Sequence, residues 1–397
     1  MSNKFNFDEI IDRTNTDSVK WNVKENELPM WIADMDFAAA PAAIEAMENS
    51  IKERVFGYKI VPQSWYESIK SWNKRRYDVD LDTSEIIFST GVIPALRSCI
   101  RAFSNVGDGV VIFTPTYNNF FTSIDYNDRK IVSCELDYKD GKYEINWDNL
   151  EKALQKEENK IFLFCNPQNP IGMSYDYESL SHIAKLCQEN DVYMFADEIH
   201  ADLTHPGYRH YSANGIDKDL QDHLIVFNSV TKPFNLAGLK GSYVVIRDEK
   251  VRKYVERRFE ADKVQENNHF VIDVMKACYS PEGEAWLDAL NEYLEVNRKL
   301  LTSKVLEEFP EIKISPADST YLAWLDLSHF TKDSAEFCEF LREKTGLVLN
   351  KGSIYGLDGK QFVRWNYASP KAMVEDSIQR FIKGMHAYID EGKSLVK

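Results

Sequence analysis

The chain has 397 residues, of which 44% are hydrophobic and 28% are charged. This composition is ordinary for globular proteins and excludes a disordered chain, and the length suits one large domain with a smaller one. The 63 acidic and 48 basic side chains give a net charge of −15, which repels nucleic-acid phosphates and anionic lipid. We therefore expect no nucleic-acid partner and no membrane partner.

The N-terminal residues lack the apolar stretch and small-residue cleavage site of a signal peptide, and the longest apolar runs are far too short to span a membrane. The six cysteines are scattered without a C-x-x-C pair, so they are expected to be reduced thiols. These features predict a cytoplasmic protein.

Between residues 48 and 285, short apolar runs alternate with helical patterns. The clearest helix places Leu180, Ile183 and Cys187 on one face. Strands that are apolar on both faces and separated by helices are typical of a buried, mostly parallel sheet, so we predict a large α/β domain over residues 48–285. The runs that predict strands are residues 86–88, 110–113, 161–165, 192–196, 224–227 and 243–246.

The C-terminal region shows a different pattern. Two stretches of alternating polarity, residues 321–327 and 361–367, are separated by a helical pattern around 334–344. This arrangement predicts a smaller α+β domain, completed by the N-terminal segment. Its parts are residues 1–47 and 286–397.

Polar and turn-forming residues follow five of the apolar runs, at the point where each predicted strand ends. Ligands of open parallel sheets bind beyond the carboxyl ends of the strands, so these residues are candidates for one site. They are Thr90-Gly91, Thr116-Tyr117, Asn166 to Gly172, Asp197 to His200, and Asn228 to Lys232.

Lys232 is the most informative of these residues. A lysine at the mouth of a buried sheet loses hydration, which lowers its pKa and makes its amine a candidate for a Schiff base. The alternative is a lysine on a solvated loop. Ser229, Thr231 and Lys240 lie near it in the sequence and could together surround a phosphate.

Two further residues allow a ligand-binding and a purely structural interpretation. Asp197 follows an apolar run, so its carboxylate needs a partner, which could be a protonated ring nitrogen or the start of a following helix. Thr90-Gly91 could present backbone N–H groups to a phosphate at a helix N-terminus, or could be a simple turn.

Seven short motifs follow one another along nearly the whole chain. They are residues 29–37 (PMWIADMDF), Phe56-Gly57-Tyr58, Asn169-Pro170-x-Gly172, Asp197-Glu198-Ile199-His200, Ser229-x-x-Lys232, residues 319–326 (STYLAWLD) and Val363-Arg364-x-Asn366. In this order they resemble the fold-type I pyridoxal-phosphate enzymes of the class I/II aminotransferase superfamily. The first string and His200 resemble the cystathionine β-lyase (C–S lyase) branch, the MalY/PatB group.

The resemblance implies a role for each residue around a pyridoxal 5′-phosphate ring. Lys232 would hold the cofactor as a Schiff base, and Asp197 would keep the ring nitrogen protonated. Asn169 and His200 would lie by the phenolic oxygen, and Tyr117 would stack on the ring and take part in catalysis.

The resemblance also implies a phosphate site and a substrate site. The phosphate would be held by the backbone N–H groups of Val92 and Ile93, by Ser229, Thr231 and Lys240, and by Tyr58 from the partner subunit of a homodimer. Lys240 stands where many members of the superfamily have arginine. Arg364 would bind the substrate carboxylate, with Ala33 and Asn169 beside it.

The implied activity is α,β-elimination from cystathionine or a cysteine S-conjugate, which gives pyruvate, ammonia and a thiol. The nearest alternative is an aminotransferase, which shares the chemistry up to removal of the Cα proton. A remote alternative is a metal-dependent oxygenase built on Asp197, Glu198, His200, Asp202 and His205, although the alternation of strands and helices is unlike the fold of such enzymes. Another remote alternative is a regulatory relative of the fold without catalysis. No metal is expected.

Overall fold

The computed structural model describes residues 5–396, and within them the six predicted apolar runs are strands of one mixed sheet. Its seven strands lie in the order β2-β10-β9-β8-β7-β3-β4. All neighbours are parallel except those of β10. The strands are β2 (Ile86–Ser89), β3 (Gly109–Thr114), β4 (Lys130–Glu135), β7 (Asn159–Cys165), β8 (Tyr193–Asp197), β9 (Leu224–Asn228) and β10 (Ser242–Val245).

Two strands differ from what the apolar runs alone indicate. β10 runs antiparallel to β9 and β2 because only a short connection without an α-helix follows β9, and a parallel neighbour needs a longer crossover. β4 lies at the edge of the sheet, where Cys134 is its one buried residue, so no apolar run marks it.

Helices cover both faces of this sheet, because successive residues of each strand point to opposite faces. Val110 and Ile112 belong to the core formed with α3 (Val92–Phe103), α4 (Asn118–Asp125) and α7 (Glu249–Asp262). Val111 and Phe113 belong to the larger core on the other face. That face is covered by α2 (Gln63–Tyr77), α5 (Trp147–Leu154), α6 (Tyr177–Glu189) and α8 (Val271–Cys278).

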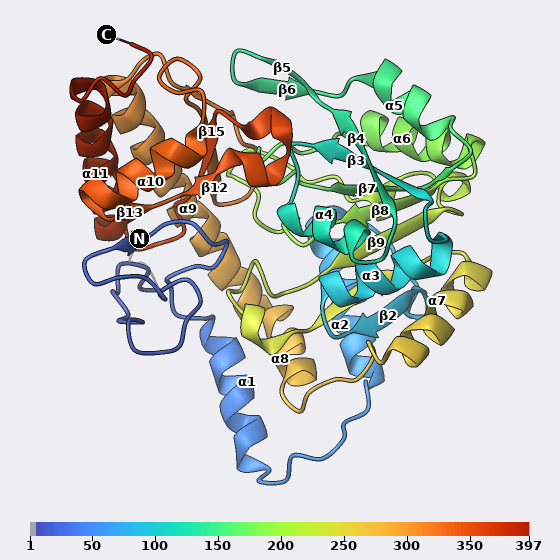
Figure 1. Cartoon of the computed structure of the whole chain (residues 1–397). Helices are drawn as coiled ribbons and strands as arrows, with labels where there is room; N and C mark the ends of the chain where they lie inside the picture. Colours follow the sequence, from blue (N-terminus) through green and yellow to red (C-terminus); the bar gives the residue numbers. More distant parts are fainter. Residues whose placement is uncertain (1–4, 397) are drawn as a thin grey trace.

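The C-terminal region forms a second, antiparallel sheet in the order β11-β12-β15-β14. Figure 1 shows its elements grouped on one side of the molecule, away from the seven-stranded sheet, with the N-terminal segment beside them. The elements are α9 (Pro281–Glu308), β11 (Lys313–Ile314), β12 (Leu322–Asp326), α10 (Ser334–Thr345), β14 (Asn350–Lys351), β15 (Phe362–Asn366) and α11 (Lys371–Asp390).

The N-terminal segment joins this C-terminal group through a short parallel pair, β1 (Leu28–Pro29) with β13 (Leu347–Val348). α1 (Pro41–Lys52) then leads away and contacts α8. A small hairpin, β5 (Asp137–Lys139) and β6 (Lys142–Glu144), lies outside both main sheets. The domain boundaries near residues 47 and 285 stay a prediction, since α9 runs through position 285. Among the described residues, no helix is long and apolar enough to cross a membrane.

Candidate active site

A cavity of about 440 Å³ lies at the carboxyl ends of β7 and β8, where the N-terminal segment and the C-terminal region also reach the large sheet. Most of the side chains predicted to form one site line it. The lining residues are Val19, Trp31, Ile32, Ala33, Val92, Ile93, Tyr117, Asn118, Asn119, Cys165, Asn169, Asp197, Ile199, His200, Lys232, Asn350, Ile354, Tyr355 and Arg364.

Lys232 follows β9 and extends into this cavity. Its Nζ atom donates a hydrogen bond to the backbone oxygen of Ala33, 2.5 Å away. Burial lowers the pKa of Lys232 to about 8, and the nearby carboxylate of Asp34 opposes that shift. Near neutral pH, a useful fraction of this amine is therefore an uncharged base and nucleophile. The interpretation as a lysine on a solvated loop is wrong.

Asp197 ends β8 and is 2% exposed. Burial raises its pKa to about 7, and the backbone N–H of Ile199, 3.1 Å from Oδ1, opposes the shift. Residues 199–202 form turns rather than the helix that an N-cap would need. Within residues 5–396 no cationic side chain forms an ion pair with this carboxylate, so Asp197 can accept a cationic partner from a ligand.

His200 and Tyr117 provide two further buried groups. Burial lowers the pKa of His200 to about 3, so its ring is neutral, and Nδ1 has no hydrogen-bond partner among the described residues. The pKa of Tyr117 is raised by burial, and its hydroxyl accepts a hydrogen bond from Asn119 at 2.6 Å. Both side chains line the cavity and present uncharged polar groups to it.

Arg364 comes from β15 and is 4% exposed. Its guanidinium donates to Asn169 Oδ1 at 3.2 Å and to the backbone oxygen of Trp31 at 2.9 Å. It also lies over the ring of Tyr355, 4.7 Å from the centroid. Its Nε has no hydrogen-bond partner, and Arg364 forms no ion pair within the part of the chain that the structure describes. It is therefore a buried cation able to bind an anionic ligand.

The start of α3 supplies a second anion site. Gly91 precedes the helix, and Val92 and Ile93 lie in its first turn and line the cavity. Backbone N–H groups of a first turn have no partner within the helix and carry the positive end of the helix dipole. This helix N-terminus can therefore bind a phosphate.

Four of the predicted cofactor residues do not line the cavity. Ser229 Oγ donates to the backbone oxygen of Gly241 at 2.6 Å and pairs with Thr231 Oγ1 at 2.8 Å. Lys240 and Tyr58 are exposed, Tyr58 fully so. Their contacts with a cofactor stay predictions.

The acidic and histidine residues considered for a metal do not converge. Asp202 accepts hydrogen bonds from Trp72 and Tyr77, and Glu198 accepts from Ser212 and the backbone of Ala213. No group of three potential metal ligands occurs among residues 5–396.

Several lining residues were not predicted from the sequence. Asn350 donates to the backbone oxygen of Trp31 at 2.7 Å and to the Tyr355 hydroxyl at 3.0 Å. Asn350 lies in the two-residue strand β14, and Ile354 and Tyr355 lie in the segment between β14 and β15, where no apolar run or motif marks them. Asn119 is two residues from Tyr117, so proximity to a candidate was the one available signal.

The polar groups of the cavity that lack a partner indicate which chemical groups a ligand of this site would carry. The buried carboxylate of Asp197 can pair with a cation of the ligand. One nitrogen of His200 and one of Arg364 have no hydrogen-bond partner in the described part of the chain, and the first turn of α3 offers backbone N–H donors. A planar ring with a protonated nitrogen, an oxygen substituent and a phosphate matches this set, and an amine-reactive carbonyl on it would meet Lys232. The residues present therefore fit a pyridoxal-phosphate cofactor.

This chain matches the family model "Aminotransferase class I and II" over residues 25–381 and belongs to that family. It is 34% identical over 382 residues to "Cystathionine beta-lyase PatB" of Bacillus subtilis, with 94% of this chain and 98% of that protein covered. It is 30% identical over 391 residues to "Protein MalY" of Escherichia coli, covering 96% and 99% of the two chains.

Among solved structures, cystalysin from Treponema denticola, which contains a pyridoxal 5′-phosphate cofactor, matches with a TM-score of 0.93 and 33% identity, covering 96% of this chain and 99% of that one. These comparisons confirm the predicted superfamily, its C–S lyase branch and the fold class.

Proposed function

We propose that this protein is a pyridoxal-phosphate-dependent C–S β-lyase that cleaves cystathionine or another cysteine S-conjugate. α,β-Elimination would give pyruvate, ammonia and a thiol. The proposal rests on one observation: the desolvated amine of Lys232 lines the same cavity as the carboxylate of Asp197, which has no ion-pair partner among the residues that the structure describes, and the buried guanidinium of Arg364. The relative named as a cystathionine β-lyase supports the choice within the family.

The cofactor would be held mainly by residues at or beyond the carboxyl ends of strands of the large sheet. Lys232 would bind it covalently, Asp197 would pair with its ring nitrogen, Asn169 and His200 would lie at its ring oxygen, and Tyr117 would stack on the ring. Its phosphate would contact the N–H groups of Val92 and Ile93, the side chains of Ser229, Thr231 and Lys240, and the partner subunit's Tyr58. When bound, pyridoxal phosphate withdraws electrons from the substrate Cα.

Arg364 would position the substrate. Its guanidinium is held by Trp31 and Asn169, so it presents a pre-oriented fork to the substrate carboxylate. Ala33 lines the same cavity. The ion pair, formed away from water, would fix the Cα–H bond relative to Lys232.

Lys232 would act as the base. A lysine pKa of about 8 leaves roughly a tenth of the amine uncharged at pH 7, enough to accept the Cα proton. Burial sustains this fraction, since it penalises the ammonium form. The same group could later return the proton to the departing sulfur.

Two features support a homodimer working in the cytoplasm. Tyr58 is 108% exposed and lies among the exposed apolar side chains of Val55, Phe56 and Ile60, which a second copy of the chain would cover. All six cysteines are free, as expected in a reducing compartment.

The test is a product assay with purified, cofactor-loaded protein and cystathionine. We expect pyruvate and free thiol to form in equal amounts without any added keto acid. An aminotransferase, the second candidate from this family, would return the proton to the cofactor instead and would need a keto acid acceptor. Strict dependence on a keto acid would contradict the lyase proposal.

A further inference from the structure

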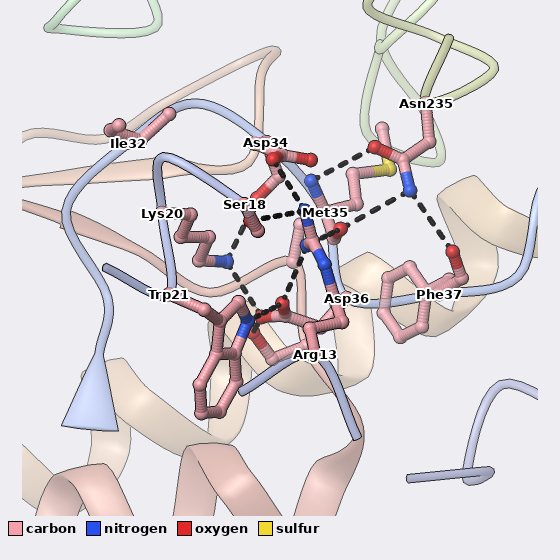
Figure 2. A network of polar contacts seen from close by, with 12 residues as sticks. Arg13, Ser18, Lys20, Trp21, Ile32, Asp34, Met35, Asp36, Phe37 and Asn235 are labelled. Atoms are coloured by element: carbon pink, nitrogen blue, oxygen red, sulfur yellow. Dashed lines mark hydrogen bonds and ion pairs between the residues drawn. The ribbon is translucent and has the colours of Figure 1, made fainter. Parts of the chain in front are cut away.

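A cluster of charged residues (Figure 2) fixes the part of the N-terminal segment whose residues 31–33 line the active-site cavity. Arg13 forms ion pairs with Asp34 at 2.8 Å and with Asp36 at 3.0 Å. Lys20, with a side chain 0% exposed, forms an ion pair with Asp36 at 2.6 Å. Ion pairs with buried members and several hydrogen bonds hold a defined geometry, unlike isolated pairs at the surface.

The backbone between these acids is held as tightly as their side chains. The amide of Asn235, three residues after Lys232, bonds to the N–H and the oxygen of Met35 and to the oxygen of Phe37 (Figure 2). The amide of Asn366, two residues after Arg364, donates to the oxygens of Ile32 and Asp34 at 2.6 and 2.8 Å. Arg13 and Lys20 add hydrogen bonds to the oxygens of Met35 and Asp34.

The backbone carbonyl of Ala33 differs from the other carbonyls of this segment in the donor that it contacts. The oxygens of Ile32, Asp34, Met35 and Phe37 accept hydrogen bonds from amide or basic side chains of the scaffold, whereas the oxygen of Ala33 accepts from the Nζ atom of Lys232. The fixed backbone therefore presents a single acceptor to the amine of Lys232, and the carboxylate of Asp34 is the next residue along the chain.

We propose that Asp34 is a positioning residue: held by Arg13, it fixes the Ala33 carbonyl as the resting acceptor for the Lys232 amine and provides that amine with a counter-charge. This inference rests on the proposed function, in which Lys232 alternates between a covalent bond to the cofactor and a free base. A free amine with one N–H directed to Ala33 has a restricted lone pair, and a restricted base removes a proton more effectively than a rotating one.

The charges that face the amine come from several elements. Asp34 and Asp197 are the acids, Arg364 is the cation, and His200 is neutral. Asp34 opposes the effect of burial on the amine more strongly than Asp197 does. Removing the charge of Asp34 alone should therefore increase the free-base fraction of Lys232.

The test compares Asp34→Asn with the wild type before the cofactor is added. Acetic anhydride reacts only with the uncharged amine, and peptide mapping isolates the rate at Lys232 as a function of pH. If the pKa falls by about one, the reactive fraction at pH 7 and the labelling rate rise about fivefold. An unchanged rate and pH profile would overturn the proposal.

Arg342→Ala is the matched control. Arg342 forms a bidentate pair with Glu27 at 2.7 Å, so it anchors the same N-terminal segment but has no hydrogen bond or ion pair with residues 32–37. Its labelling profile should equal that of the wild type. A change in Arg342→Ala as large as that in Asp34→Asn would mean that general loosening of the segment, not Asp34, acts on the amine, and would also overturn the proposal.

A second variant guards against failure of Asp34→Asn to fold. In cofactor-loaded Arg13→Gln, we expect kcat to fall about tenfold, KM to change less than about twofold, and the Cα-deuterium isotope effect on kcat to rise, because proton removal becomes slower. An isotope effect and kcat equal to those of Arg342→Ala would contradict the proposal.

The proposed function and this inference fail in different ways. If borohydride reduction of the wild-type holoenzyme leaves no pyridoxyl group on Lys232, the proposed function fails. If the group is present and the labelling profile of Asp34→Asn is unchanged, only the positioning role of Asp34 fails.

Discussion

At the scale of single residues, the site is built from groups whose preferred charge state burial has altered. Burial raises the pKa of Asp197 to about 7 and lowers those of His200 to about 3 and Lys232 to about 8. Each shift disfavours the charged form. A cofactor with a ring cation would restore the charged form of Asp197, so binding and ionisation are coupled.

This coupling predicts how the cofactor-free protein depends on pH. The folded pKa of Asp197 lies above the unfolded value of about 3.8, so the folded state binds this proton more tightly, and the contribution of Asp197 to stability falls as pH rises from about 4 to 7. Asp197→Asn removes this penalty. We therefore expect the variant to gain stability relative to the wild type as pH rises through this window, measured by urea unfolding.

His200 titrates in the same window, but it is present in both proteins, so its effect cancels in the difference. A stability difference between Asp197→Asn and the wild type that stays constant from pH 4 to 7 would contradict the burial argument for Asp197.

We expect substitution of Arg364 by lysine to lower kcat/KM without affecting the cofactor. Arg364→Lys keeps the charge but loses the planar fork that Asn169 and Trp31 orient. Hydrogen bonds to charged groups contribute about 1.5–3 kcal/mol, so kcat/KM should fall about 10- to 150-fold. Cofactor absorbance should not change.

The control for Arg364→Lys is the substrate. The decarboxylated amine analogue of a cysteine S-conjugate cannot use Arg364, so the variant and the wild type should bind it with similar inhibition constants. If the analogue and the full substrate lose affinity equally, Arg364 does not bind the carboxylate.

A residue of the site could be predicted from the sequence where it follows an apolar run or belongs to a recognisable motif. Asp197 and Lys232 follow apolar runs, so reading the end of each strand found them. Asn350 lies in the two-residue strand β14, Ile354 and Tyr355 lie in the short 3-10 turn that follows it, and all three line the cavity. Neither periodicity nor spacing marks such residues.

At the scale of elements, the ends of strands and the start of a helix place the residues of the site together. β7, β8 and β9 are parallel and in register, with Cys165 and Phe227 opposite Asp197, so their following loops meet at one edge. The helix α3 points its first turn at the same place. The direction of β10 could not be read from its apolar run, because a buried strand is equally apolar in either direction.

Val92→Pro tests the phosphate site at the start of α3. Proline is tolerated at the first position of a helix, and the ψ of 154° at Gly91 suits a following proline, so the helix should persist. The substitution removes one backbone N–H. We expect pyridoxal phosphate to bind about tenfold or more weakly in equilibrium titration, because a hydrogen bond to a charged group is lost.

Val92→Ala is its control, because it changes the side chain at the same buried position but keeps the N–H group. Equal dissociation constants for Val92→Pro and Val92→Ala would show that the helix N-terminus does not hold the phosphate.

At the scale of the whole molecule, two regions distant in sequence complete the site. The N-terminal segment supplies Trp31 and Ala33, and β15 supplies Arg364. The smaller α+β part was predicted from its alternating strands. The cluster of Arg13, Lys20, Asp34 and Asp36 was not predicted, because polar contacts between distant segments leave no local pattern in the sequence.

The exposed Tyr58 predicts shared active sites. Tyr58→Ala and Lys232→Ala should each be nearly inactive, but a mixed dimer would have one site with both residues intact. After unfolding and refolding of an equal mixture, about a quarter of the wild-type activity should return, because half the dimers are mixed and each has one of two sites restored. Unmixed refolding of each variant is the control, and absence of recovery in the mixture would contradict a Tyr58 shared between subunits.

The most direct test of the account is to reduce the pyridoxal-phosphate-loaded protein with borohydride and map the modified peptide. We expect one pyridoxyl group, on the Nζ atom of Lys232, and loss of the visible absorbance in Lys232→Ala. A pyridoxyl group on another lysine, or none at all, would contradict it.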